Sequence, residues 1–164
     1  MTLSKELSQK LWDKGNVAKT KEVRKKKAAP GERFLINKDN TVTDKKTGLL
    51  IIQDPTLLSE VFKATMTFAA AEAAIAELNK KGYAGFKDWR LPTVEELVGM
   101  TDRTKHNPCY DTSIFKGKFN DWYWSSETCA WNKDAAWCVS SDGGIVDFFG
   151  KVSRSYVRPV RSCQ

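Results

Sequence analysis

The segment from Ser59 to Lys80 constrains the fold more than any other stretch of the sequence. Its apolar residues recur at helical spacing, and its alanine-rich middle favours a helix intrinsically. Gly82 follows it and is a typical residue for a helix end. The pattern predicts one long amphipathic helix near the middle of the chain. Its apolar stripe would consist of Val61, Phe62, Met66, Phe68, Ala69, Ile75 and Leu78.

Short strand patterns lie on both sides of this helix. A Ser-Asp-Gly-Gly stretch in the later group is typical of a tight hairpin, since such turns need positive φ angles. Seven strands are predicted, over residues 34–36, 41–43, 49–52, 122–126, 135–140, 145–149 and 156–161. The order predicts an α+β fold with two helices packed on antiparallel β-sheets.

The stretch Gly82 to Leu97 (GYAGFKDWRLPTVEEL) predicts the second, shorter helix. Thr93 and Glu96 have the spacing of a capping box, in which each side chain binds the backbone N–H of the other residue. Asp88 and Arg90 are two residues apart, so on an extended chain they share a face and could form an ion pair. We interpret this stretch as scaffold rather than as a catalytic site.

Basic residues are concentrated at the start of the chain. Residues 1–30 hold nine lysines and arginines against three acids, whereas the rest hold 18 basic and 17 acidic residues. We therefore expect a basic N-terminal arm with a short helix over 1–30, and a nearly neutral main domain over 31–164. The alternative is a solvent-exposed tail that binds no partner, because such a tail would have the same composition. If the arm binds nucleic acid or an acidic partner, the candidate residues are Lys21, Arg24, Lys25, Lys26 and Lys27.

The sequence gives no sign of export or of a metal site. No apolar run could span a bilayer, and the N-terminus lacks a continuous apolar signal segment, so we expect a cytoplasmic protein without membrane insertion. Cys109, Cys129, Cys138 and Cys163 contain no C-x-x-C pair. They predict free thiols rather than a disulfide framework or a zinc site. The chain has a single histidine, His106, and we expect no metal and no cofactor.

Five motifs, in this order, resemble the Lcl C-terminal domain family: RFLINKDNTVTDKKTGLL, YAGFKDWRLPTVEEL, WYWSSET, AAWCVSSDGG and YVRPVR. The resemblance covers about residues 33–161 and implies a C-type-lectin-like fold. Family members often carry one cysteine near the end of the long helix and another inside the last motif. Here Leu78 and Pro159 stand at those positions. The absence of both is consistent with a reducing compartment.

The chain also resembles the variable proteins of diversity-generating retroelements. Those proteins keep a fixed C-type-lectin scaffold and vary surface residues in their C-terminal part, which corresponds here to about residues 122–161. The resemblance implies a non-enzymatic receptor or display module with an unknown protein ligand. The candidate ligand-binding residues are Trp131, Asn132, Asp134, Cys138, Ser140, Val146, Phe148, Phe149, Val152 and Arg154.

Strand alternation refines this set. It places Ile145 and Asp147 on one buried face and Val146 and Phe148 on the other, so at least one of Phe148 and Phe149 is expected at the surface. An exposed aromatic cluster is typical of a binding surface. Packing of both phenylalanines against the long loop predicted over residues 103–121 is the alternative.

Two other functions stay open as alternatives. Formylglycine-generating enzymes have a related fold and use a cysteine pair, for which Cys129 and Cys138 are the candidates. Neither has the cationic sequence neighbours that activate a thiol, and we expect no enzymatic activity. The basic arm could bind nucleic acid, although no aromatic residue for base stacking stands between Lys19 and Lys27. The oligomeric state is not predicted.

Overall fold

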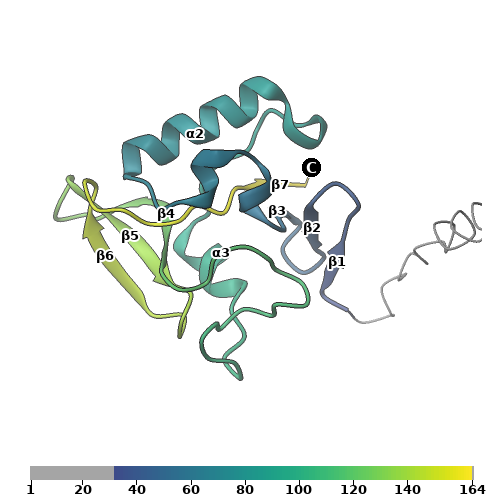
Figure 1. Cartoon of the computed structure of the whole chain (residues 1–164). Helices are drawn as coiled ribbons and strands as arrows, with labels where there is room; N and C mark the ends of the chain where they lie inside the picture. The colour runs from purple at the N-terminus through teal and green to yellow at the C-terminus, as the bar shows by residue number, and fades with distance from the viewer. Residues whose placement is uncertain (1–31, 164) are drawn as a thin grey trace, which may run out of the picture. The chain divides into compact units, whose positions relative to one another are not determined.

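The computed structural model of the protein describes residues 32–163, whose helices and strands are shown in Figure 1. This part of the chain contains two antiparallel sheets and two α-helices, in agreement with the α+β prediction. None of its helices is long and apolar enough to cross a membrane. The predicted basic arm, its short helix and its five candidate nucleic-acid residues lie outside the described residues.

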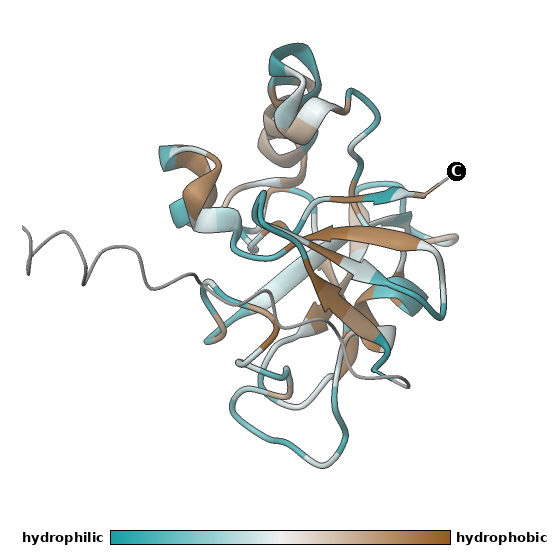
Figure 2. Cartoon of the chain, turned by 90° about the vertical axis from the view of Figure 1, so that its right-hand side faces the viewer, coloured by the Kyte–Doolittle hydropathy of each residue, from teal (hydrophilic) through white to brown (hydrophobic). Residues whose placement is uncertain are grey.

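The first sheet joins the two ends of the described chain. It consists of β1 (Phe34–Ile36), β2 (Thr41–Asp44), β3 (Leu49–Ile52) and β7 (Val160–Ser162), in the spatial order β1-β2-β3-β7. The turns between β1 and β2 and between β2 and β3 contain Asn40 and Gly48, and both residues have positive φ. β3 is buried along its whole length. Figure 2 shows most strand segments in brown and most connecting loops in teal, as expected for strands that form the core.

The second sheet consists of β4 (Trp122–Thr128), β5 (Ala135–Ser140) and β6 (Val146–Gly150), in that order. The predicted hairpin between β5 and β6 is confirmed. The Ser140 N–H donates to the Ile145 carbonyl at 2.8 Å, and the Gly144 N–H donates to the Ser140 carbonyl at 3.0 Å. Gly144 has a φ of 71°, which explains the need for glycine there. Figure 1 shows this hairpin at the opposite end of the domain from β1.

Helix α2 (Phe68–Lys81) begins nine residues later than the sequence predicts. The chain before it forms a short 3-10 helix, η2 (Glu60–Lys63), and Met66 then makes a β-bridge with Ser155. The two hydrogen bonds of this bridge, 2.9 and 3.0 Å long, require an extended backbone that is incompatible with a helix. Thr67 then caps α2 through its side chain.

The start of α2 was predicted too early because the apolar residues before Phe68 have helical spacing. Phe62 and Met66 are buried, as a helical stripe would require, but they reach the core from 3-10 and extended backbone. Val61 and Ala69 belonged to the predicted stripe and are exposed. The predicted end is confirmed, since Gly82 caps α2 with a φ of 66°. Two further 3-10 turns, η1 (Pro55–Leu57) and η3 (Tyr83–Gly85), complete the connections.

Helix α2 packs on one face of the second sheet. Phe68 and Ile75 of the helix share a core cluster with Trp124 and Cys138 of the sheet. The rings of Phe68 and Trp124 meet edge to face, with centroids 5.6 Å apart. The indole N–H of Trp124 donates to the Met66 carbonyl at 2.8 Å, so the buried polar atom is satisfied.

Helix α3 (Val94–Gly99) starts at the predicted capping box. The Thr93 hydroxyl accepts from the Glu96 N–H at 3.1 Å, and the Glu96 carboxylate accepts from the Thr93 N–H at 2.8 Å. Arg90 donates to both carboxylate oxygens of Glu96, at 2.8 and 2.7 Å. Leu97 is fully buried. The stretch that contains these residues is therefore a frame that fixes α3, as the sequence indicated.

The predicted ion pair between Asp88 and Arg90 is wrong. The backbone of Arg90 forms a β-bridge with Val160, which brings Asp88 beside the last strand. Asp88 accepts there from the guanidinium of Arg161 at 2.7 and 3.0 Å. Arg90 is left to bind Glu96, so the two charges find separate partners.

The ion pair between Arg90 and Glu96 predicts a pH dependence of stability. Burial alone would raise the pKa of the Glu96 carboxyl, but the bonds from Arg90 and the Thr93 amide outweigh it and lower the pKa below 4.5. Because the pKa of Glu96 is lower in the folded state than in the unfolded state, its ionised carboxylate stabilises the fold at pH values above the unfolded-state pKa. This stabilisation is lost as the pH falls through the folded-state pKa. The urea concentration at the unfolding midpoint should therefore fall between about pH 5 and pH 3, and we expect this fall to be smaller in the Glu96→Gln variant. An equal slope in both proteins would contradict this.

The final predicted strand, residues 156–161, is mostly irregular, and β7 begins only at Val160. Within this segment Arg158 is fully buried. Its guanidinium donates to the carbonyls of Ile52 (2.8 Å), Gln53 (2.6 Å) and Lys116 (2.7 Å). Arg158 therefore joins the end of β3 to the loop that precedes β4, and so connects the two sheets.

Candidate ligand-binding face

The two faces of β5 have different neighbours. Ala136 and Cys138 face the core cluster that includes α2. On the other face, Val139 packs with Leu97 of α3 and is fully buried. Trp137 lies on that same face, two residues along the strand, but is only half-buried. Part of this face of the second sheet is therefore left uncovered by the residues that the structure describes.

Three aromatic rings gather on the uncovered part of the sheet. Trp137 pairs directly with Phe148 across β5 and β6. Trp131 lies over both, with ring centroids 5.5 Å from Trp137 and 5.5 Å from Phe148, and the third distance is 5.7 Å. All three contacts are edge to face. Trp131 is 67% exposed and Phe148 is 39% exposed. We call Trp131, Trp137 and Phe148 the aromatic face.

A hydrogen-bonded turn holds Trp131 in place. The Cys129 N–H donates to the Ala135 carbonyl at 3.0 Å, and the Ala135 N–H donates to the Asn132 carbonyl at 3.2 Å. The side-chain oxygen of Asn132 accepts from the Asp134 N–H at 3.0 Å. Cys129 is fully buried at the base of the turn. A ring held in this way loses little conformational entropy when it binds a partner.

Two aliphatic side chains extend the exposed apolar surface near the hairpin turn. Val146 is 41% exposed and Ile145 is 62% exposed. Strand alternation predicted burial of Ile145 and Asp147, and this is wrong because both are exposed. Ile145 belongs to the turn rather than to β6, and β6 is the edge strand of its sheet.

The free edge of β6 is partly occupied by hydrogen bonds within the chain. The Phe148 N–H donates to a carboxylate oxygen of Asp147 at 2.8 Å. The Gly150 carbonyl accepts from the Ser153 N–H at 2.8 Å. Such bonds disfavour the addition of a further strand. The face of the hairpin, rather than its edge, is therefore the more accessible surface for a partner.

Three of the predicted ligand-binding residues point away from this surface. Cys138 is fully buried beside α2, and Ser140 is buried as well, so neither can contact a ligand in this structure. Phe149 is half-buried and meets Trp122 edge to face, with centroids 5.0 Å apart. Phe148 is the exposed member of the phenylalanine pair, as the expectation of at least one required.

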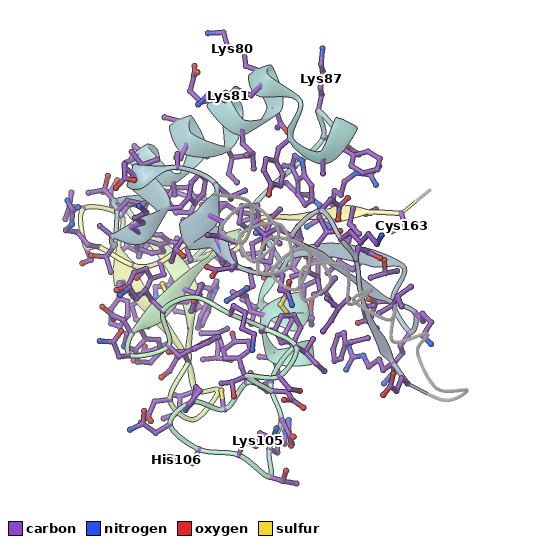
Figure 3. The ribbon with its side chains drawn as sticks, turned by 45° about the vertical axis from the view of Figure 1, so that its right-hand side comes forward. Lys80, Lys81, Lys87, Lys105, His106 and Cys163 are labelled. Carbon is purple, nitrogen blue, oxygen red and sulfur yellow. The ribbon has the colours of Figure 1, made fainter. Side chains whose placement is uncertain are left out.

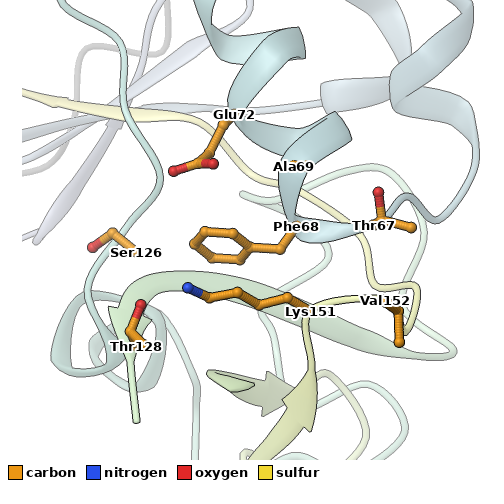
Figure 4. Close-up of a pocket in the computed structure, with 8 residues that line it drawn as sticks. All are labelled: Thr67, Phe68, Ala69, Glu72, Ser126, Thr128, Lys151 and Val152. Atoms are coloured by element: carbon orange, nitrogen blue, oxygen red, sulfur yellow. The ribbon is translucent and has the colours of Figure 1, made fainter. Parts of the chain in front are cut away.

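Val152 and Arg154 belong to a second surface, on the α2 side of the sheet. Val152 lines a shallow pocket of about 420 Å³ at the beginning of α2, shown in Figure 4. The side chain of Lys151 crosses this pocket beneath the ring of Phe68, with its ammonium 4.9 Å from the ring centroid. Arg154 donates to the Thr65 carbonyl at 2.6 Å. The predicted residues are thus divided between two surfaces.

Residues 40–161 match the family model described as the Lcl C-terminal domain. The chain belongs to this family. No curated protein matches the chain. In this Lcl C-terminal domain the aromatic face lies wholly within the matched residues, whereas the basic arm lies outside them. The family resemblance inferred from the five sequence motifs is thereby confirmed.

Trp137 is the one member of the aromatic face that is not among the predicted ligand-binding residues. The sequence did contain a signal for its position. The hairpin turn pairs Ser140 with Ile145, and antiparallel counting from there pairs Trp137 with Phe148. Two bulky rings directly opposite each other on one face form a cross-strand pair.

The thiols of this Lcl C-terminal domain are free, and most of them are buried. Cys109, Cys129 and Cys138 are buried, whereas Cys163 is exposed. Burial raises the pKa of the Cys138 thiol to about 12, and burial also raises the pKa of Cys109. A nucleophilic cysteine needs a lowered pKa and access to solvent. Cys109 and Cys138 therefore have the properties of core residues.

The single histidine lies in the loop between α3 and β4. Figure 3 shows His106 near Lys105 at the bottom of the view, away from Cys163 on the right. His106 is exposed, and its Nε2 lies 3.6 Å from a carboxylate oxygen of Asp142. Within residues 32–163, no group of three histidine, cysteine or acidic side chains is placed to hold a metal ion.

Proposed function

We propose that the protein is a ligand-binding display module and that the aromatic face is its binding surface for a protein. The observation that carries the proposal is a cluster of three mutually packed aromatic rings on a rigid sheet, of which Trp131 and Phe148 are exposed and Trp137 is half-buried. Large exposed aromatic side chains are enriched at the centres of protein interfaces. Because core packing fixes β5 and a hydrogen-bonded turn fixes Trp131, the surface is organised before a partner arrives.

We further propose a C-type-lectin-like fold for residues 31–164. Two features support this assignment. The first and last described strands share one sheet, and the helices and the second sheet are inserted between them. The family match over residues 40–161 is the second feature. Loops and strands presented by such a frame are a common place for binding functions.

The proposal includes diversification of the surface by a retroelement. Trp131, Asp134, Val146 and Phe148 are exposed, whereas the strands behind them are anchored by buried side chains. Exchange of exposed residues generally changes stability little, so such positions tolerate diversity that the core would not. Cys138 and Ser140 leave the proposed variable set because both are buried.

The alternative of a thiol enzyme is less well supported. The raised pKa of Cys138 and the complete burial of Cys129 are the opposite of what cysteine catalysis requires. Nucleic-acid binding by residues 1–30 stays a separate proposal that rests on charge alone. If that proposal is correct, deletion of residues 1–30 should abolish a strongly salt-dependent affinity for DNA.

Two libraries displayed on cells test the binding function. The first randomises the exposed Trp131, Ile145, Val146 and Phe148. The matched control randomises four buried positions of the same sheet, namely Tyr123, Trp124, Cys138 and Val139. We expect most members of the first library to resist protease and some to bind proteins of a test panel, whereas most control members unfold. Equal loss of folding in both libraries, or no binder from the first, would contradict the proposal.

A further inference from the structure

We infer that the domain binds an ordered internal water molecule, which bridges the hydroxyl of Tyr110 and the Nε of Arg158. Both atoms are buried, and neither has a hydrogen-bond partner among residues 32–163. Tyr110 is 1% exposed and Arg158 is 0% exposed. Buried polar groups in folded proteins are nearly always satisfied by the protein or by ordered water. The site lies in the interior of the domain, so it is independent of the proposed binding surface.

The two unpartnered groups share the same aromatic surroundings. The ring of Tyr110 packs against three other rings, at centroid distances of 6.0 Å to Phe115, 5.5 Å to Phe119 and 6.1 Å to Tyr123. The guanidinium carbon of Arg158 lies 5.6, 5.6 and 5.5 Å from the centroids of these same three rings. The shared rings place Tyr110 and Arg158 in one enclosed cluster, where a single small ligand can serve both.

The hydrogen-bonding chemistry of the pair fits a water oxygen. Burial raises the pKa of the Tyr110 hydroxyl, so this group stays protonated at neutral pH. The Nε of Arg158 carries one N–H, which can donate but cannot accept. A direct bond from Nε to the hydroxyl would leave the hydroxyl proton unpaired, whereas a water oxygen can accept from both groups.

The hydroxyl of Tyr123 offers the water a third partner. It donates to the Lys118 carbonyl, and it receives only a long contact of 3.5 Å from the Nη2 of Arg158. A lone pair of this hydroxyl can therefore accept a proton from the water. The water would then make three hydrogen bonds, and buried waters in proteins typically make about three.

The environment of the guanidinium favours a neutral ligand over an anion. Its charge already faces the carbonyl oxygens of Ile52, Gln53 and Lys116, which accept hydrogen bonds from it. It also lies over three aromatic rings, whose faces carry partial negative charge. An anion in this cluster would be repelled by the ring faces and would lose its hydration. Water carries no such cost.

Tyr110→Phe tests the inference because it removes the hydroxyl and little else. We expect the equilibrium constant for unfolding by urea to rise about fivefold, since the bound water loses a partner. Tyr156→Phe is the matched control, because it removes a hydroxyl from a half-buried tyrosine, and it should change this constant by less than about twofold. Without a bound water, phenylalanine would replace an unsatisfied buried group. A Tyr110→Phe variant as stable as the native chain, or more stable, would therefore overturn the inference.

A high-resolution crystal structure of the full-length chain, grown in a bromide salt, observes the ligand directly. We expect a water peak within hydrogen-bond distance of both Tyr110 Oη and Arg158 Nε, and we expect Tyr110→Phe to weaken or displace it. Three results would each overturn the inference. They are the lack of a peak, an anomalous bromide signal at this position, and a direct contact between Oη and Nε.

Discussion

Replacing Arg158 with methionine is expected to lower the free energy of unfolding by about 3–5 kcal/mol. Arg158 is fully buried and donates to the carbonyls of Ile52, Gln53 and Lys116. Methionine fills much of the space but donates nothing, so buried carbonyl oxygens lose their partners. Because Ile52 ends β3 of the first sheet and Lys116 lies in the loop that leads into β4 of the second sheet, the whole domain should be destabilised rather than one loop.

Urea unfolding followed by tryptophan fluorescence measures this effect. Arg158→Lys is the matched control, because it keeps the charge but offers a point donor in place of a planar fork. We expect the lysine variant to be intermediate between the native chain and the methionine variant. A methionine variant with an unchanged urea midpoint would show that Arg158 is not needed to join the two sheets.

A second large effect is expected for Trp89→Ala, which should cost about 3–5 kcal/mol of stability. The indole of Trp89 packs with Leu50, Ile52 and Leu78. Its N–H donates to the Tyr83 carbonyl at 3.0 Å. Alanine would leave a cavity next to α2 and an unpaired carbonyl, and each kcal/mol lowers the melting temperature of a domain of this size by roughly 3 °C.

Trp131→Ala provides the comparison with an exposed tryptophan. Trp89 is 2% exposed and Trp131 is 67% exposed, so the same substitution should leave the melting temperature nearly unchanged at Trp131. Phe148→Ala should likewise leave the fold intact. If Trp131→Ala unfolds the domain, Trp131 is a core residue and the aromatic face is misassigned. If Trp89→Ala melts normally, the segment Gly82–Leu97 is not scaffold.

Local patterns in the sequence were sufficient to predict the first six strands approximately, the hairpin and the capping box. Each of these depends on interactions between residues close together in the chain, such as the paired bonds of Thr93 and Glu96. The start of α2 was not predictable in this way. Met66 is held extended by a β-bridge to Ser155, a partner 89 residues away. The spacing of apolar residues around Met66 does not indicate that bridge.

The candidate site was predictable only in part. Exposure of Trp131 and Phe148 agreed with the expectation for a binding surface, but burial of Cys138 depends on the packing of α2 against the far side of the sheet. The burial of Arg158 was not predictable from the sequence either. A charged residue near the C-terminus is usually solvent-exposed. Its burial follows from carbonyl groups that converge on it from distant parts of the chain.

Deep sequencing of the gene from a natural population is the most direct test of the proposal that a fixed frame displays a variable binding face. We expect substitutions at adenine-containing codons to be concentrated between residues 129 and 154, at exposed positions such as Trp131 and Phe148. Buried positions such as Cys138 and Arg158, and residues 31–120, should be constant. Substitutions scattered evenly along the gene, or absent from the exposed positions, would contradict diversification of this face.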